Sequence, residues 1–131
     1  MSFPAALPPH STTVMVVDDE PFVRILCRRM LEAEGYRVHE AADGLAALSA
    51  LREHGPVDAV ITDLQMPNMD GFALATYLVG QSPRIPILLM SGYDQHHDKV
   101  RALGPLLLKP FGPDQLVQGL RMALGTQAQS A

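Results

Sequence analysis

Apolar residues along the chain fall into five short runs, and these runs are separated by segments in which apolar residues recur every three or four positions. Three runs are continuously apolar and a fourth is apolar at its centre, as expected of strands buried on both faces, and one alternates, as expected of a strand nearer a sheet edge. The runs predict strands over residues 14–17, 36–41, 57–62, 85–90 and 106–108. The intervening segments predict helices over residues 20–35, 43–55, 70–80, 94–103 and 113–124, of which the fourth has few apolar positions.

This alternation predicts the α/β class, with a five-stranded parallel sheet covered by helices on both faces. The common strand order for such a sheet is 2-1-3-4-5, which gives a flavodoxin-like (βα)5 three-layer sandwich with a switch point between strands one and three. We expect one domain over residues 13–125. The proline-rich residues 1–12 are interpreted as a disordered leader or linker, and residues 126–131 as a flexible tail.

Composition and charge argue against several classes of protein. The chain has 131 residues, which fits one domain, and its formal charge of −4 argues against non-specific binding to nucleic acid. No apolar run approaches the roughly 18 residues that span a bilayer, and the first residues lack a secretory signal pattern. The single cysteine, Cys27, excludes an internal disulfide and fits a reducing compartment. We therefore predict a cytoplasmic protein with no membrane partner and no direct nucleic-acid partner.

Polar residues stand where four of the predicted strands end. Asp18 and Asp19 follow the first strand, and Asp63 follows the third. Ser91 and Lys109 follow the fourth and fifth strands. Because the carboxyl ends of parallel strands meet at one edge of the sheet, we expect these side chains to share a site at the switch point. Taken singly, Asp18, Asp19 or Asp70 is as readily explained as a helix cap or a turn residue.

The grouped residue types are those of a site for phosphoryl transfer. Three neighbouring carboxylates repel one another and need a cation or protons. Mg²⁺ prefers hard oxygen ligands and suits one or two carboxylates together with a phosphate. A lysine supplies a mobile positive charge for a phosphate oxygen, and a serine hydroxyl can donate to another. With a nucleophilic aspartate, these groups make a site that holds a transferred phosphoryl group.

Four sequence segments surround these residues and occur in this order: Val16-Val17-Asp18-Asp19-Glu20, Thr62-Asp63-Leu64-Gln65-Met66-Pro67-Asn68-Met69-Asp70-Gly71, Met90-Ser91-Gly92-Tyr93 and Leu108-Lys109-Pro110-Phe111. In combination they resemble the receiver domains of bacterial two-component response regulators, over about residues 14–124. The resemblance extends both to stand-alone regulators and to receivers attached to hybrid sensor kinases. It implies a role in phosphorelay signalling.

The resemblance implies that Asp63 accepts a phosphoryl group from a phosphohistidine of a sensor histidine kinase or a histidine phosphotransfer protein. The reaction would depend on Mg²⁺, for which Mn²⁺ can substitute. Asp19 would bind the metal directly, and Asp18 would act mostly through water. Asp63 and the backbone carbonyl of Gln65 would be further ligands. Lys109 would pair with the phosphate.

The resemblance also implies that phosphorylation changes the conformation of the domain. Ser91 would turn towards the acyl phosphate and pull its loop inward, and the bond between Lys109 and Pro110 would be cis, which X-Pro bonds adopt at low cost. Receivers commonly carry an aromatic switch residue three positions before the lysine, and this chain has Leu106 there. The fourth helix, fifth strand and fifth helix are the expected responding elements, and a homodimer through them is compatible with the sequence.

Partner contacts follow from the same resemblance. The first helix of receivers commonly docks the phosphodonor protein, so Phe22, Val23 and Arg24 are expected contacts. A downstream protein target would then read the switched surface.

An aspartyl-nucleophile phosphatase and an interaction module independent of phosphorylation are the two alternative functions. Phosphatases of the aspartyl-nucleophile type carry a second aspartate two residues after the nucleophile, and Gln65 at that position removes the acid. An interaction module that works without phosphorylation would be expected to lack an acidic residue, the serine or the lysine, and none is missing. We therefore expect no enzyme activity beyond the chain's own phosphotransfer and autodephosphorylation.

Overall fold

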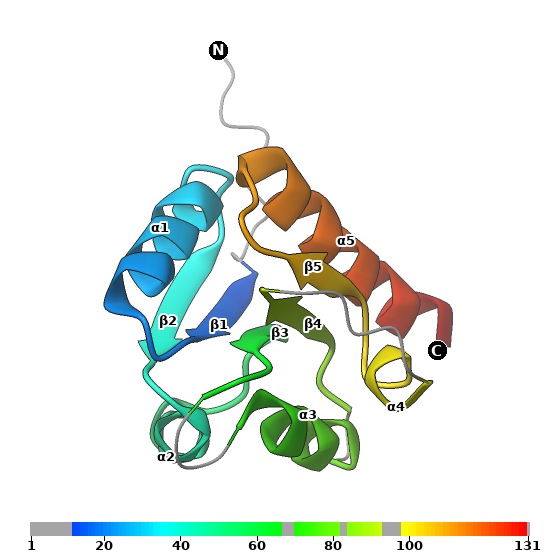
Figure 1. Ribbon diagram of the computed structural model, residues 1–131. Coiled ribbons are helices and arrows are strands. Elements are labelled where there is room, and N and C mark those ends of the chain that lie inside the picture. The colour runs from blue at the N-terminus through cyan, green and yellow to red at the C-terminus, as the bar shows by residue number, and fades with distance from the viewer. Residues whose placement is uncertain (1–11, 67–69, 82–83, 93–97, 131) are drawn as a thin grey trace.

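A single parallel sheet forms the centre of the molecule (Figure 1). The computed structural model describes residues 12–66, 70–81, 84–92 and 98–130, and of residues 126–130 the backbone alone. The strands pair in the order β2-β1-β3-β4-β5, which confirms the predicted fold class and strand order. Their bounds are β1 Thr13–Val17, β2 Arg37–Ala41, β3 Ala59–Asp63, β4 Ile87–Ser91 and β5 Leu106–Leu108.

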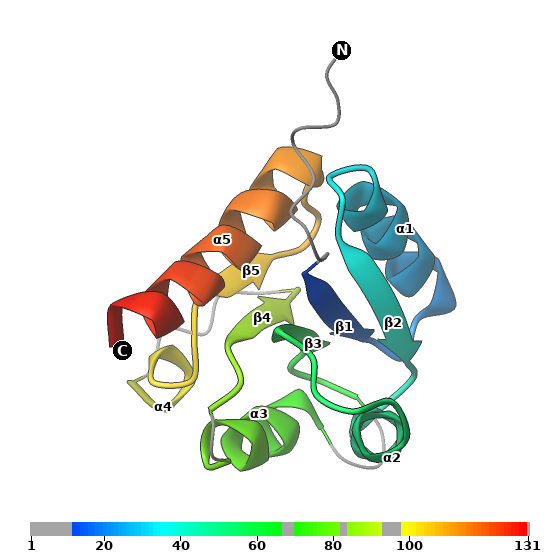
Figure 2. The same ribbon diagram turned by 180° about the vertical axis from the view of Figure 1, so that it is seen from behind.

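Helices cover both faces of this sheet, so the molecule has three layers (Figures 1 and 2). Helices α1 and α5 lie together on one face, and α2 and α3 lie on the other. The short α4 lies beyond β5, and its Val100 packs in the same core as residues of α2 and α3 (Figure 1). The helix bounds are α1 Pro21–Glu32, α2 Gly44–His54, α3 Gly71–Val79, α4 Asp98–Arg101 and α5 Pro113–Ser130.

Side chains of successive strand residues enter two separate cores, one under each pair of helices. In β1, Met15 and Val17 belong to the core under α2 and α3, whereas Val14 and Val16 belong to the core under α1 and α5. All four are fully buried. Because both faces are covered, the strand has no polar alternation, and each such side chain contributes about 1.5–3 kcal/mol by leaving water.

Several predicted bounds are wrong, and the differences have physical causes. Strands β3 and β4 begin two residues later than the predicted residues 57 and 85. Val57 and Ile85 are apolar because they pack against the core under α2 and α3, not because they pair in the sheet. Pairing with β1 starts at Ala59, opposite Val14.

Helix ends were predicted less well than strand positions. Helix α5 continues to Ser130, so its predicted end at residue 124 is wrong. Helix α4 ends at Arg101 instead of residue 103. The first part of the predicted fourth helix, residues 94–97, lies outside the described residues, as does most of the predicted leader. Within the part of the chain that the structure describes, no helix combines the length and the apolar character needed to cross a bilayer.

Candidate functional site

An acidic cluster lies at the carboxyl edge of the sheet, where β1 and β3 are neighbours. Asp18 and Asp19 follow the last residue of β1, and Asp63 is the last residue of β3. One carboxylate oxygen from each of the three lies within 4.8 Å of the others. Asp18 is fully buried and Asp63 is 7% exposed, whereas Asp19 faces solvent. The three carboxylates that the sequence predicted to meet therefore do meet.

Lys109 reaches into this cluster from the end of β5. Its ammonium Nζ donates hydrogen bonds to Oδ2 of Asp18 at 2.9 Å and to Oδ2 of Asp63 at 3.3 Å. The same nitrogen lies 3.8 Å from Oε1 of Glu20. Burial acts to lower the pKa of Lys109, but the hydrogen bond and charge of Asp18, then those of Asp63, outweigh it and raise the pKa. Lys109 therefore stays positively charged within the cluster.

The surroundings of Asp63 disfavour the ionised form of its carboxyl group. Burial raises the pKa of Asp63, the positive charge of Lys109 partly offsets that rise, and the negative charge of Asp18 adds to it. Its other oxygen, Oδ1, accepts a hydrogen bond from the backbone N–H of Gln65 at 3.3 Å. A cation close to this carboxylate would stabilise its ionised form.

Asp18 is held at each of its polar groups. Its backbone N–H donates to the carbonyl of Ala41 at 3.2 Å, and its carbonyl accepts from Nη1 of Arg24 at 2.7 Å. Its side-chain Oδ1 accepts from the backbone N–H of Glu20 at 2.9 Å, and Oδ2 accepts from Lys109. A fully buried carboxylate is tolerated here because all of these partners compensate its loss of water.

The ends of β4 and β5 complete the edge. Ser91 is the last residue of β4 and is almost fully buried, and its carbonyl accepts a hydrogen bond from the backbone N–H of Lys109 at 2.8 Å. The peptide bond between Lys109 and Pro110 is cis, as the family resemblance implied. Leu106 is the first residue of β5 and packs, half-buried, against the core under α2 and α3. The switch roles predicted for Ser91 and Leu106 stay predictions.

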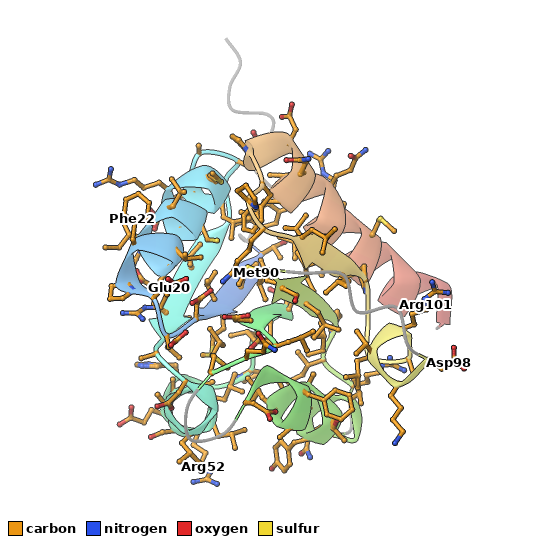
Figure 3. The ribbon with its side chains drawn as sticks, in the orientation of Figure 1. Glu20, Phe22, Arg52, Met90, Asp98 and Arg101 are labelled. Atoms are coloured by element: carbon orange, nitrogen blue, oxygen red, sulfur yellow. The ribbon has the colours of Figure 1, made fainter. Side chains whose placement is uncertain are left out.

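The three predicted partner contacts differ in how they lie on α1. Phe22 is 75% exposed and points away from the molecule (Figure 3). Val23 is half-buried against the core under α1 and α5. Arg24 is turned inward, with only 17% of its side chain exposed. The structure thus leaves Phe22 available to a partner and gives Arg24 internal contacts.

Helix α3 begins directly against the end of β3, which is a feature that sequence reasoning missed. A side chain at Gly71 would overlap the backbone carbonyl of Asp63. The backbone N–H of Gly71 donates to the carbonyl of Leu64 at 3.1 Å, and Asp70 caps the helix by accepting from the N–H of Ala73 at 2.8 Å. The sequence did contain an indication of this contact, the glycine at position 71. Glycine destabilises a helix and is favoured where another part of the backbone approaches closely.

The donor set of the acidic cluster fits a hard divalent cation. It groups carboxylate oxygens from three residues that lie close together, at the switch point of a parallel sheet. Asp19 is the exposed member and lies at the mouth of the cluster, where a partly hydrated ion can be accommodated. The cluster is thus suited to hold Mg²⁺.

Comparison with known proteins agrees with this geometry. The family described as the response regulator receiver domain matches residues 14–121. The response regulator GtcR of Aneurinibacillus migulanus is 36% identical over 118 residues, which cover 87% of this chain and 48% of that protein. The sensor kinase CckA of Brucella abortus is 38% identical over 122 residues, which cover 89% of this chain and 13% of the kinase.

A solved structure gives the same result. The chemotaxis response regulator CheY4 of Vibrio cholerae superimposes with a TM-score of 0.78 at 31% identity, covering 88% of this chain and all of that chain. By contrast, the chain spans about half the length of regulators such as GtcR and the probable transcriptional regulatory protein TcrX of Mycobacterium tuberculosis. The similarity to these longer proteins is therefore confined to one of their parts.

Proposed function

The chain belongs to the response regulator receiver domain family of two-component signalling, and on that premise we propose that it accepts a phosphoryl group on Asp63. The observation that carries the proposal is the position of Asp63 between two further aspartates and the ammonium group of Lys109. The donor would be a phosphohistidine of a sensor histidine kinase or of a histidine phosphotransfer protein. A cytoplasmic location is part of the proposal.

In the proposed step, an oxygen of the Asp63 carboxylate forms a new bond to phosphorus while the bond from phosphorus to the donor imidazole nitrogen breaks. The electron pair of the broken bond stays on the imidazole, which then takes up a proton. The product is an acyl phosphate on Asp63. Such a transfer has a loose transition state, so positioning and charge account for most of the catalysis.

Asp18, Asp19 and Asp63 would hold the Mg²⁺, together with the backbone carbonyl of Gln65, and Mn²⁺ can take its place. When bound, the ion supplies positive charge close to the oxygens of the transferred group. Lys109 supplies a second positive charge, because its flexible stem lets Nζ leave Asp18 and Asp63 and pair with a phosphate oxygen.

The phosphoryl group would then bias the surface formed by α4, β5 and α5. Ser91 and Lys109 connect the phosphoryl site to this surface. Ser91 lies at the end of β4, and its carbonyl accepts a hydrogen bond from the backbone N–H of Lys109. A turn of the Ser91 hydroxyl towards the phosphate would displace the end of β4, which pairs with the end of β5. Leu106 would transmit less than an aromatic residue, because it is a smaller side chain packed in the core.

The donor protein would dock on α1, whose first turn follows Asp19 directly. Phe22 is 75% exposed, and Ile25 and Leu26 on the same helix are 45% and 40% exposed. Exposed apolar side chains of this size at helical spacing suit the apolar face of a partner helix. A downstream target or a second copy of the chain would use α4, β5 and α5, where Leu108 and Met122 are exposed.

The experiment is a phosphorylation assay with Mg²⁺ and a small-molecule phosphodonor, read by intact mass. Wild type is expected to gain one acid-labile phosphoryl group, and Asp63→Asn is expected to gain none. Asp114→Asn, an exposed aspartate at the start of α5, is the matched control and should label like wild type. Equal labelling of wild type and Asp63→Asn would refute the proposal. Turnover of an added phosphomonoester would instead favour the phosphatase alternative.

A further inference from the structure

Arg24 lies in the second turn of α1, and its guanidinium group bridges two elements next to the acidic cluster. Nη1 donates to the backbone carbonyl of Asp18 at 2.7 Å, and Nε donates to Oε1 of Glu40 on β2 at 3.3 Å. Only 17% of the arginine side chain and 22% of the glutamate side chain are exposed. The contacts are therefore largely shielded from water, which strengthens charge-assisted hydrogen bonds.

The carbonyl of Asp18 needs such a partner. Helix α1 begins at Pro21 with Glu20 as its N-cap, and the N–H of Arg24 pairs with the carbonyl of Glu20, so among the described residues the Asp18 carbonyl lies before the first helical hydrogen bond. At the other end of the same residue, the N–H of Asp18 pairs with Ala41 on β2. Arg24 thus fixes the second backbone group of the residue that precedes Asp19.

Glu40 keeps Arg24 in this orientation. Its Oε1 accepts from Arg24, and its Oε2 accepts from Nη1 of Arg28 at 2.9 Å. Arg28 also pairs with Glu32 at 3.0 Å, and among the described residues its hydrogen bonds go to these two glutamates and not to the acidic cluster. The chain therefore offers two neighbouring arginines on one helix that share Glu40, of which one reaches Asp18 and the other does not.

We propose that Arg24 is a positioning residue for the metal site: by binding the Asp18 carbonyl and Glu40 at once, it fixes the turn from β1 to α1 so that Asp18 and Asp19 face Asp63. This inference rests on the proposed function, because it concerns the cation that the phosphoryl transfer needs. It also gives Arg24 a role other than the partner contact expected from the sequence. The guanidinium reaches its two acceptors with two separate nitrogens, Nη1 and Nε, whereas a lysine at this position would have one nitrogen for both.

The first test is a titration with Mn²⁺ alone, followed by electron paramagnetic resonance, with no phosphodonor present. Arg24→Gln is expected to bind Mn²⁺ about tenfold more weakly than wild type, since one charge-assisted hydrogen bond typically changes an equilibrium by that factor or more. Arg28→Gln is the matched control and should stay within about twofold of wild type by the same scale. Equal weakening in both variants would overturn the inference, because it would assign the effect to the ion pairs of α1 in general.

The second test needs no metal. Amide hydrogen exchange in the presence of a chelator should show faster exchange at Asp18 and Glu20 in Arg24→Gln than in wild type or Arg28→Gln. The Asp18 N–H donates to Ala41 on β2 and the Glu20 N–H donates to the Asp18 carboxylate, so both hydrogen bonds depend on the position of the turn that Arg24 fixes. Unchanged exchange at these two amides would overturn the inference. If Arg24→Gln does not fold, Arg24→Lys and Arg28→Lys form the deciding pair, with the same order of Mn²⁺ affinity expected.

The two proposals fail in different ways. Wild type that binds no Mn²⁺ and takes up no phosphoryl group would refute the proposed function, while the exchange experiment would still decide whether Arg24 holds the turn. Wild type that binds Mn²⁺ as proposed, with Arg24→Gln equal to it, would refute only the positioning role.

Discussion

A buried carboxylate such as Asp18 is stable only while its partners stay in place. Its four polar groups are bound by Ala41, Arg24, Glu20 and Lys109, and Lys109 is the only one of these partners that brings positive charge to the carboxylate itself. Phosphoryl transfer would draw Lys109 away, and a bound cation would take over its compensating role. Under the proposed function, the lysine and the metal ion would be alternative counter-charges for the same carboxylates.

Substitution of Lys109 tests whether the lysine and a cation compensate the same carboxylates. Lys109→Ala leaves Asp18 fully buried without a counter-charge, so the free energy of unfolding in a chelator should fall by about 2–3 kcal/mol, somewhat less than for a fully buried pair because Lys109 is partly exposed. Mg²⁺ should restore more stability in this variant than in wild type. Urea unfolding with and without Mg²⁺ measures both effects. Lys99→Ala, an exposed lysine on α4, should change neither.

The thiol of Cys27 gives a pH-dependent test of the packing under α1. Burial, then the charge of Asp18, raises the pKa of Cys27 from 9.0 to about 12. The native state therefore holds this proton more tightly than the unfolded chain does. The stability linked to it is fully present below pH 9 and is lost as the pH rises from about 9 to about 12.

The difference in unfolding free energy between wild type and Cys27→Ala isolates this group from others that titrate in the same range. That difference should be constant up to about pH 8.5 and shrink above it. The native thiol should also stay unreactive towards a disulfide reagent at pH 8, because it is 1% exposed and protonated. Rapid labelling of the folded protein would contradict this account.

At the scale of elements, the contact between β3 and α3 decides where Asp63 lies. Asp63 pairs with Met90 in the sheet register, and its carbonyl lies directly against the first residue of α3. The glycine at position 71 is what allows this approach, and Asp70 supplies the cap that starts the helix there. Asp63 is thus held by its strand on one side and by a helix terminus on the other.

Gly71→Ala should therefore displace Asp63 by disturbing the contact between β3 and α3. The added methyl group cannot fit beside the Asp63 carbonyl, so we expect a loss of about 1–3 kcal/mol in unfolding free energy and slower phosphorylation. Gly80→Ala, at the other end of α3, is the matched control, since a methyl group there meets only ordinary contacts and φ is −82°. Thermal unfolding and initial labelling rates measure the two effects. An unchanged rate in Gly71→Ala would contradict the positioning argument.

The order of the elements and the central residues of the site could be predicted from the sequence because they depend on local patterns. Apolar runs predict parallel strands, and residues at the ends of such strands must share an edge, which brought Asp18, Asp63 and Lys109 together. The inward turn of Arg24 was not predictable, since it depends on Glu40 from another strand and the residue looks like any surface arginine in a helical pattern. Strand bounds were misplaced where Val57 packs in the core without pairing.

At the scale of the whole molecule, the two helical layers have different surfaces next to the site. Helix α1 begins at the carboxyl edge and exposes Phe22, Ile25 and Leu26, while Arg24 between them is bound internally. Helix α2 on the opposite layer exposes Leu45. A donor protein that docks along α1 would bring its phosphohistidine to the edge where Asp63 lies, whereas docking along α2 approaches from the other layer.

Docking and chemistry can be separated by comparing two phosphodonors. Phe22→Ala should leave stability almost unchanged, because the ring is 75% exposed, and should leave labelling by a small-molecule phosphodonor at the wild-type rate. Transfer from a phosphorylated histidine phosphotransfer protein should slow about tenfold or more, as for the loss of a central apolar anchor. Leu45→Ala, with a side chain 55% exposed on the other layer, should match wild type with both donors. Equal slowing of transfer from the protein donor in Phe22→Ala and Leu45→Ala would show that α1 is not the docking face. Slower labelling of Phe22→Ala by the small-molecule phosphodonor as well would show that the ring acts on the site itself and not on docking.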